Sequence, residues 1–325
     1  MTTVITAELS AGMELTLEEQ AGVRTLVERL GRTAPGLVDD AAWQAQARAA
    51  SCQLPPRLLA ALRSYRSDPG LDGTLTIVNL PITADPLPPT PNVPDSVERA
   101  ATAPASVAML LGQQLGEVIA YRDEKHGALV QNVVPVPKLA SSQSNGGSVP
   151  LELHTENAFH PNRPDYVGLL CLRGAQEDRV GTRVAAVRRA LPLLDEVDRT
   201  ILHEARFITA APPSFVSADR SEPHPVLRGC VDDPDICVDF HATSALDAAA
   251  ARALSQLREA LTEVECELVL QPGDMVFVDN RLVVHGRIAF WPRYDGTDRW
   301  LHRIFVHLDN RRSRPRRADN GAVLV

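Results

Sequence analysis

The chain contains a strand-like run that ends in a His-x-Glu pair, Leu151-Glu152-Leu153-His154-Thr155-Glu156. In a β-strand, side chains two positions apart point to the same face, so His154 and Glu156 can both reach one metal ion. Such a pair alone is weak evidence, because the chain holds nine histidines and 41 acidic residues. A second pair of this kind, His307-Leu308-Asp309, has no histidine after it and is not expected to bind metal.

A third candidate ligand, His285, lies downstream of an apolar segment that reads as a strand, Met275-Val276-Phe277-Val278-Asp279. Two neutral imidazoles and one carboxylate hold one face of a metal ion and leave the opposite face open. Non-haem Fe(II) oxygenases use this arrangement, because they need open positions for a co-substrate and dioxygen. The combination of His154, Glu156 and His285 therefore indicates this reaction class.

Two arginines after His285 are candidates for binding carboxylates. Arg299 and Arg303 have the spacing of one strand face, so both side chains can point inward. An arginine can hold a carboxylate through two parallel hydrogen bonds, which a lysine cannot do. Each arginine taken alone is equally compatible with an exposed surface position.

Composition limits the domain organisation and the partners. With 325 residues, 44% of them hydrophobic, the chain can bury a large core, and we expect one domain over residues 1–325. The net charge of −8 argues against nucleic acid and anionic membranes as partners, so we expect a small-molecule partner. The five arginines of residues 311–317 are expected to form a solvated tail.

The cysteines indicate a reduced compartment. Their number is odd, none forms a C-x-x-C motif, and the sequence shows neither a secretory signal nor an apolar run long enough to span a bilayer. We therefore expect a cytoplasmic location.

Helical signals dominate the first part of the chain. Thr16 and Glu19 have the spacing of a capping box, and residues 1–70 are expected to be mostly helical. Residues 74–80 read as a strand, and Pro104 can open a further helix.

From Leu129 onward, short strand-like runs alternate with turn residues, and one helix is expected at about residues 245–261. This pattern is typical of a double-sheet jelly roll. We expect a mainly β fold with flanking helices, in which a double-stranded β-helix (jelly-roll, cupin-like) core carries the N-terminal helical part. Residues 139–150 are either an ordinary surface loop or a candidate lid loop that orders over the substrate.

Three stretches of the sequence together resemble a known family. They are residues 151–160, the segment from Asp279-Asn280-Arg281 to His285-Gly286-Arg287, and residues 294–300. In combination they look like the clavaminate synthase-like Fe(II)/2-oxoglutarate oxygenases. The likeness is greatest to the hydroxylases of free amino acids in antibiotic biosynthesis, asparagine oxygenase first and the arginine β-hydroxylases next.

The resemblance implies an iron site, a co-substrate site and a substrate site. Fe(II) would be held by His154, Glu156 and His285, and 2-oxoglutarate and O2 would be the co-substrates. The distal carboxylate of 2-oxoglutarate would pair with Arg299 and Thr182. Four residues would contact the amino acid: Glu124 its α-amino group, Arg303 its α-carboxylate, and Asn145 and Asp239 its side chain.

The expected reaction is hydroxylation of an unactivated C–H bond, Cβ in this family, of a free amino acid. Arginine hydroxylases of this kind present two aspartates two positions apart, whereas this chain has Cys237 before Asp239. A single carboxylate can accept hydrogen bonds from an amide NH2, so asparagine is expected first, then arginine, lysine or citrulline. The alternative for Asp239 is a carboxylate that caps a turn.

Other functions remain as alternatives at this stage. A non-catalytic jelly-roll binding protein would have no need for all three ligands and both arginines. An oxygenase of the same fold that performs desaturation or ring closure would use the same ligands. A zinc hydrolase is disfavoured, because the sequence has no H-E-x-x-H helix. The sequence leaves the oligomeric state open.

Overall fold

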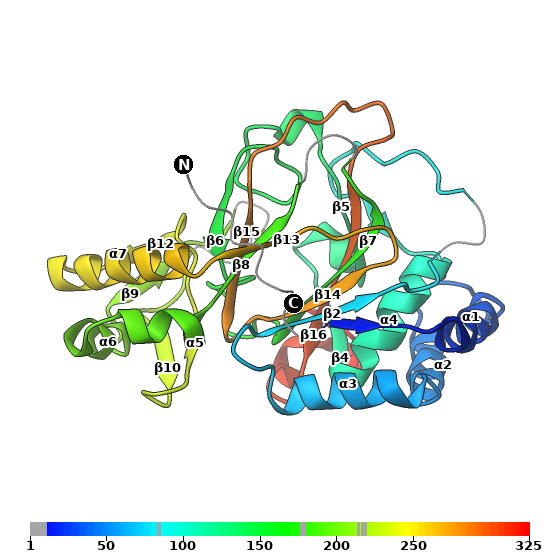
Figure 1. The fold of residues 1–325 in the computed structure, drawn as a ribbon, viewed down its shortest axis with the longest axis horizontal. Helices are drawn as coiled ribbons and strands as arrows, with labels where there is room; N and C mark the ends of the chain where they lie inside the picture. Colours follow the sequence, from blue (N-terminus) through cyan, green and yellow to red (C-terminus); the bar gives the residue numbers. More distant parts are fainter. Residues whose placement is uncertain (1–11, 83–85, 176–179, 213–214, 216–219) are drawn as a thin grey trace.

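Two β-sheets lie between two groups of helices in the computed structural model, which describes residues 12–82, 86–175, 180–212, 215 and 220–325 (Figure 1). One sheet has nine strands and the other has four, and two short strand pairs accompany them in the described residues. Helices and strands are both abundant there, so the fold is mixed helix and sheet rather than mainly β.

The N-terminal helices cover one face of the nine-stranded sheet (Figure 1). The predicted capping box is confirmed, because the Thr16 hydroxyl accepts a hydrogen bond from Glu19 N and the Glu19 carboxylate accepts one from Thr16 N. Pro104 lies in the first turn of α4, which is buried on nearly all sides between the other three helices and the sheet. The helices are α1 Leu17–Gly31, α2 Ala41–Ser51, α3 Pro56–Ser67 and α4 Ala103–Leu115.

The nine-stranded sheet is built mainly from antiparallel pairs, and only its pairs β1–β2 and β17–β4 are parallel in the described residues. Along the sheet the strands are β1 Gly12–Glu14, β2 Thr74–Val78, β14 Met275–Asp279, β7 Tyr166–Arg173, β16 Trp300–His307, β4 Glu117–Tyr121 and β17 Val323–Leu324. Two more strands lie off this path, β5 Val130–Val133 against β16 and β3 Val97–Glu98 against β5.

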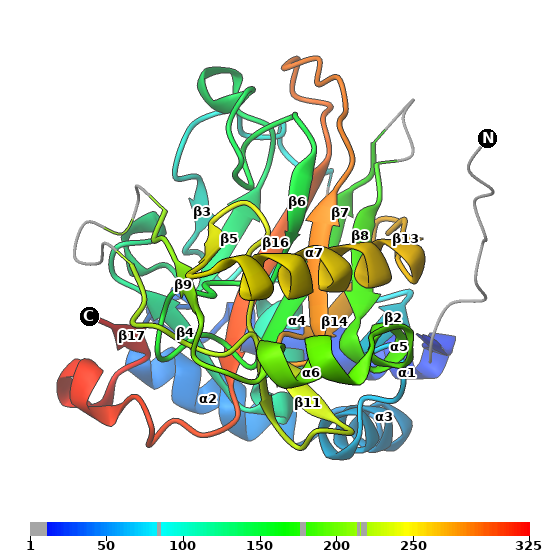
Figure 2. The same cartoon turned by 90° about the vertical axis from the view of Figure 1, so that its left-hand side faces the viewer.

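The four-stranded sheet is antiparallel throughout. Its order is β13 Cys266–Leu268, β8 Thr182–Ala186, β15 Val283–Arg287 and β6 Leu151–His154. The helices beside it are α5 Val187–Ala190, α6 Glu196–Leu202 and α7 Ala248–Glu263, and α7 runs across the strands in Figure 2. The short strand pairs are β9 Phe207–Thr209 with β12 Thr243–Ala245, and β10 Leu227–Gly229 with β11 Pro234–Ile236. The 3₁₀ turns are η1 Lys125–Gly127, η2 Pro137–Leu139, η3 Leu191–Leu193, η4 Arg314–Arg316 and η5 Ala318–Asn320.

Alternation along β16 determines which of its side chains can reach the second sheet. Ile304 and Val306 belong to the core that includes the N-terminal helices. Leu301 and Phe305 belong to a second core, which also contains residues of β8, β15 and α7. Because Arg303 lies between Ile304 and His302 in sequence, its side chain points with Leu301 and Phe305 toward the four-stranded sheet.

Other sequence predictions had mixed outcomes. The helix expected at residues 245–261 is confirmed as α7, which begins after Asp247 as a side-chain N-cap. The expectation of a solvated arginine tail holds for Arg311, Arg314 and Arg316, which are exposed, but not for Arg317. Arg312 pairs with Asp165 at 2.9 Å, and Arg317 is buried and donates to the carbonyls of Asn320 and Gly321. Among the described residues, no helix combines the length and apolar character needed to cross a membrane.

Candidate metal and substrate site

The three predicted metal ligands lie together where β6 and β15 run side by side. His154 ends β6, and its register partner in β15 is His285. The two imidazole centroids are 4.5 Å apart, and Glu156 Oε2 lies 3.5 Å from His285 Nε2. One ligand atom from each residue lies within 4.8 Å of the others, and the described residues contain no other such cluster.

Gly286 allows this close approach of the two strands. A Cβ atom at position 286 would lie 2.5 Å from the carbonyl oxygen of Leu151. Any side chain at this position would therefore push β6, and His154 with it, away from β15.

Both imidazoles can present a lone pair to a metal. His154 Nδ1 lies 2.9 Å from the carbonyl oxygen of Glu152. Since a carbonyl only accepts, Nδ1 carries the proton and Nε2 keeps its lone pair, an arrangement common for histidine ligands. Burial, and then the neighbouring His154, lower the pKa of His285, so its ring is neutral.

Glu156 is ionised although it is buried. Burial alone would raise its pKa, but Arg303 and His285 outweigh this effect, and the pKa lies well below the usual range. Two imidazoles and one carboxylate within reach of one ion are a donor set that would fit Fe(II).

Arg303 connects the ligand cluster with the predicted substrate residue Glu124. Its Nη1 donates to Glu156 Oε1 at 3.0 Å, its Nη2 pairs with Glu124 Oε1, and its Nε donates to Gln131 Oε1 at 3.1 Å. Burial raises the pKa of Glu124, and Arg303 opposes that rise. All four side chains lie in one charged, largely buried group.

Arg299 lies one residue before β16 and is buried. Its Nη2 donates to Thr182 Oγ1 at 3.2 Å. Arg287, two residues after His285, is equally buried. Neither guanidinium forms an ion pair with a carboxylate of the described residues. Burial lowers the pKa of Arg299, and burial and then Arg299 lower the pKa of Arg287 to about 10.

Arg299 and Arg287 are buried cations without a carboxylate partner among the described residues, so the region around them favours the binding of an anion. Thr182 adds a hydroxyl that can donate a further hydrogen bond. The structure therefore brings Arg299 and Thr182 together, as the predicted co-substrate site requires.

The two residues predicted to contact the substrate side chain are held by backbone contacts, Asp239 with His154 and Asn145 with Arg287. Asp239 bridges to His154, and its Oδ1 accepts hydrogen bonds from His241 N at 2.8 Å and Ala242 N at 3.1 Å. The turn-capping alternative is thus correct for one of its oxygens. Asn145 is half-buried, and its carbonyl accepts a hydrogen bond from Arg287 at 3.4 Å.

Asn280 was not recognised as a site residue from the sequence, although it lies within the motif quoted for the resemblance. Its Oδ1 accepts a hydrogen bond from Glu156 N at 2.7 Å. Its Nδ2 donates to the carbonyls of Glu156 at 3.1 Å and Pro164 at 2.8 Å. The side chain is fully buried and fixes the backbone of the predicted carboxylate ligand.

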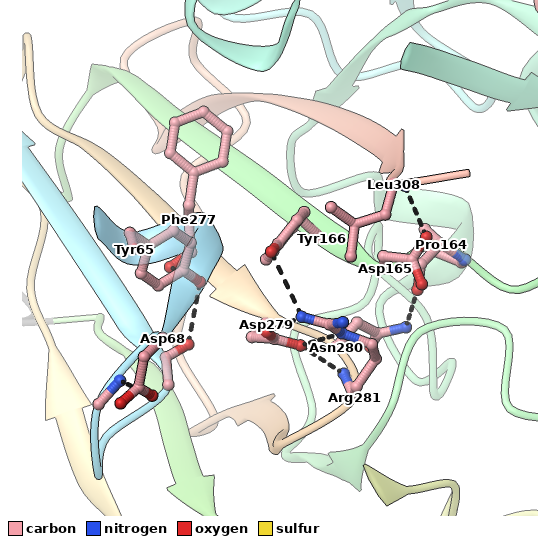
Figure 3. A network of polar contacts seen from close by, with 12 residues as sticks. Tyr65, Asp68, Pro164, Asp165, Tyr166, Phe277, Asp279, Asn280, Arg281 and Leu308 are labelled. Atoms are coloured by element: carbon pink, nitrogen blue, oxygen red, sulfur yellow. Dashed lines mark hydrogen bonds and ion pairs between the residues drawn. The ribbon is translucent and has the colours of Figure 1, made fainter. Parts of the chain in front are cut away.

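The residues on either side of Asn280 anchor this turn (Figure 3). Asp279 pairs with Arg281, whose guanidinium also donates to Tyr166 Oη at 3.3 Å, and Asn280 N donates to the Asp165 carbonyl at 2.8 Å.

Gln131 is a second site residue that was not recognised from the sequence. Its side chain contacts Arg303, and its Nε2 is buried with no hydrogen-bond partner within the described segments.

Comparison with known proteins gives consistent results. Residues 105–305 match the sequence model of the family described as taurine catabolism dioxygenase TauD, TfdA family. L-asparagine oxygenase from Streptomyces coelicolor is 46% identical over 303 residues, which cover 93% of this chain and 91% of the relative. L-lysine 3-hydroxylase from Catenulispora acidiphila is 35% identical and covers 98% of this chain and 89% of the relative.

Solved structures agree with these relatives. A crystal structure of asparagine oxygenase with Fe(II), 2S,3S-3-hydroxyasparagine and succinate has a TM-score of 0.94 and 44% identity, covering 96% of this chain and 98% of the other. The non-heme iron oxygenase OrfP with Fe and alpha-ketoglutaric acid has a TM-score of 0.87 and 32% identity, covering 97% and 100%.

Proposed function

We propose, because the chain belongs to the taurine catabolism dioxygenase family TauD/TfdA, that it is an Fe(II)- and 2-oxoglutarate-dependent hydroxylase of a free polar L-amino acid. L-asparagine is the first candidate substrate, followed by arginine, lysine and citrulline. The observation that carries the proposal is the cluster of His154, Glu156 and His285 next to two buried arginines, Arg299 and Arg303. Antibiotic or other natural-product biosynthesis is the proposed setting, since clavaminate synthase 2 and enduracididine beta-hydroxylase are among the relatives.

The ligand cluster would hold Fe(II), and Arg299 together with Thr182 would hold the co-substrate. With iron bound, 2-oxoglutarate and O2 supply the oxidising power to break a substrate C–H bond, and the keto acid leaves as succinate and carbon dioxide. Arg299 and Thr182 are proposed to bind the distal carboxylate of 2-oxoglutarate. The low polarity of their surroundings strengthens this pairing, because a buried charge gains more from a partner than an exposed one.

Arg303 and Glu124 suit the two charges of a free amino acid. The guanidinium would bind the α-carboxylate and the carboxylate would bind the α-ammonium, so that the zwitterion replaces their mutual ion pair. Gln131 Nε2 supplies a further buried donor on the same side. Asp239 and Asn145 would receive the substrate side chain, and together these contacts would decide which carbon is oxidised.

The finer architecture is part of the proposal. The two sheets are taken as the halves of a double-stranded β-helix (jelly-roll, cupin-like), supported by the position of β15 between β8 and β6 with His285 facing the other sheet. Residues 1–325 are taken as a single oxygenase domain, since α1 to α4 share one core with β2, β7, β14 and β16. A cytoplasmic location is supported by five unpaired thiols. The net charge of −8 supports a small-molecule partner rather than nucleic acid or a membrane.

A screen of free amino acids tests the function. Purified protein with Fe(II), 2-oxoglutarate and O2 is incubated with each amino acid, including citrulline and ornithine, and substrate-dependent succinate is measured. NMR of the product then locates the added oxygen and separates hydroxylation from desaturation and ring closure. The expected result is a hydroxylated Cβ of asparagine or another polar amino acid.

A matched variant tests the assigned substrate site. Glu124→Gln keeps the shape of the side chain but removes the charge that would bind the α-ammonium, so the KM for the amino acid should rise at least tenfold. Anaerobic binding of 2-oxoglutarate, followed by the weak visible charge-transfer band, should change less than threefold. Activity with carrier-bound or peptidyl substrates only would contradict the roles given to Glu124 and Arg303.

A further inference from the structure

Arg287 has no role in the proposed reaction. Its side chain is nevertheless buried, next to the proposed co-substrate site and next to the loop that carries Asn145. Arg287 lies two residues after His285 in β15, so the two side chains share one strand face. Its register partner in β8 is Thr182, whose hydroxyl accepts a hydrogen bond from Arg299 Nη2 at 3.2 Å, so Arg287 and Arg299 belong to the same part of the site and their like charges repel. A buried arginine in this position needs a structural or functional reason, because removing a charge from water is costly.

Within the described residues, the side-chain hydrogen bonds of Arg287 reach the loop of residues 139–150. Its Nη1 donates to the Asn145 carbonyl at 3.4 Å and its Nη2 to the Val149 carbonyl at 3.2 Å. Its Nε is buried and has no hydrogen-bond partner among the residues that the structure describes. Its guanidinium lies 5.0 Å from the centroid of the Phe290 ring, and Phe290 N donates to the Ser148 carbonyl at 3.0 Å.

The loop itself is tightly folded, so a clamp at two points can hold it as a unit. Gly147 leaves room for no side chain, since its Cβ would lie 2.0 Å from the Ser142 carbonyl oxygen. Val136 N donates to the Gly146 carbonyl at 2.9 Å, and Ser148 N donates to the Ala140 carbonyl at 2.9 Å. Asn145 lies within this unit and is the proposed contact for the substrate side chain.

We propose that Arg287 is a positioning residue that couples the 2-oxoglutarate site to the substrate loop 139–150. It holds the loop through the carbonyls of Asn145 and Val149, while its charge is stabilised by the carboxylate that Arg299 binds. The inference rests on the function proposed above and extends it. A bound dicarboxylate screens the repulsion between Arg287 and Arg299, which strengthens the clamp, and a closed loop retains the dicarboxylate in return.

Two substitutions separate the effect of the positive charge of Arg287 from the effect of its two hydrogen-bonding guanidinium nitrogens. Arg287→Lys keeps the charge but can reach only one carbonyl at a time, whereas Arg287→Gln removes the charge as well. Arg173→Lys is the matched control, because Arg173 also donates to two loop carbonyls, Pro88 at 3.0 Å and Gly296 at 2.9 Å, away from residues 139–150.

Hydrogen exchange of the loop amides is measured with and without 2-oxoglutarate, in anaerobic Fe(II) protein. In the wild type, 2-oxoglutarate should slow exchange of residues 139–150 at least fivefold. Both Arg287 variants should exchange there at least tenfold faster than the wild type, and 2-oxoglutarate should no longer slow them. The Kd for 2-oxoglutarate should rise about fivefold in Arg287→Lys, which loses the reciprocal coupling, and about tenfold or more in Arg287→Gln, which loses the charge as well. Arg173→Lys should leave residues 139–150 unchanged.

The coupling also predicts a change in the amount of succinate formed per hydroxylated product. A purely structural role of Arg287 would leave this ratio unchanged. With the loop released, Arg287→Lys should form more succinate per hydroxylated product than the wild type, because the substrate is held less well while 2-oxoglutarate still binds. Exchange in α7 serves as the check that each variant is folded.

Loop exchange within twofold of the wild type in folded Arg287→Lys and Arg287→Gln overturns the proposal. So does a 2-oxoglutarate effect on the loop that persists unchanged in both. The ligand-free comparison is independent of the proposed function. If the wild type binds no 2-oxoglutarate at all, the proposed function fails, whereas the clamp is still judged by the ligand-free exchange rates.

Discussion

Replacing Asn280 by alanine should damage the metal site through a residue that touches no metal. The Asn280 side chain accepts one hydrogen bond from Glu156 N and donates two, to the carbonyls of Glu156 and Pro164. Glu156 is 124 positions away in sequence, so this single side chain determines where the loop after β6 lies relative to β15.

The expected loss of stability follows from the buried backbone groups that lose their hydrogen-bond partner when Asn280 is replaced by alanine. One buried N–H and two buried carbonyls each cost about 1–3 kcal/mol when unsatisfied, so with partial relaxation the free energy of unfolding should fall by roughly 3–5 kcal/mol. Replacing a residue that orients a metal ligand typically lowers metal affinity by about 10–100-fold. The same loss is therefore expected in the affinity of the His154, Glu156 and His285 cluster for Fe(II) or Mn(II).

The assay compares metal-free stability with metal affinity. Urea unfolding in the presence of a chelator gives the first quantity, and anaerobic Fe(II) or Mn(II) titration gives the second. Asn132→Ala is a matched control, because Asn132 is also buried and uses its side chain twice, accepting from Trp300 Nε1 at 2.8 Å and donating to Ser96 Oγ at 2.9 Å. It should lose stability but keep metal affinity within about threefold. Equal metal affinity in folded Asn280→Ala and wild type would refute the reasoning.

Three further predictions use single substitutions. Arg299→Ala should weaken 2-oxoglutarate binding roughly a hundredfold or more, since breaking a buried charged pair costs ~3–5 kcal/mol; an unchanged Kd in an anaerobic titration would remove the assignment. Glu156→Ala should abolish hydroxylated product, and full activity would mean that another group coordinates iron. His302→Leu tests a buried histidine whose ring nitrogens have no hydrogen-bond partner in the described part of the chain and whose pKa burial lowers to about 3. Because an unfolded histidine takes up its proton near pH 6.5, His302 makes stability fall by about 1.4 kcal/mol per pH unit as the pH drops from about 6.5 toward 3. Urea unfolding with chelator between pH 6.5 and 4.5 should show a shallower fall for His302→Leu, and identical slopes would contradict this.

Local patterns in the sequence predicted what local physics determines. The capping box at Thr16 and Glu19 depends on residues three apart, and its hydrogen bonds are present. The start of α4 at Pro104 and the helix α7 are likewise set by nearby residues. His154 and Glu156 could be paired because strand geometry brings side chains two apart to one face.

Contacts between distant segments could not be predicted in this way. Asn280 and Arg287 act on segments more than 100 residues away, and their partners are backbone groups that carry no sequence signal. Arg317 has the same explanation, because its burial depends on a turn formed by residues 310–321. The predicted fold, mainly β with flanking helices, holds in the coarser form of a mixed helix and sheet structure, because the helices on both sides of the two sheets take up a comparable share of the described chain.

The candidate residues are divided between rigid strands and connecting segments. His154, His285 and Thr182 belong to the four-stranded sheet, and Arg303 belongs to β16. Asn145 and Asp239 lie outside the regular strands, where replacement disturbs the scaffold least. Laboratory evolution toward new amino acids should therefore begin at the connecting segments, where selectivity can diverge while the oxidation chemistry is inherited unaltered.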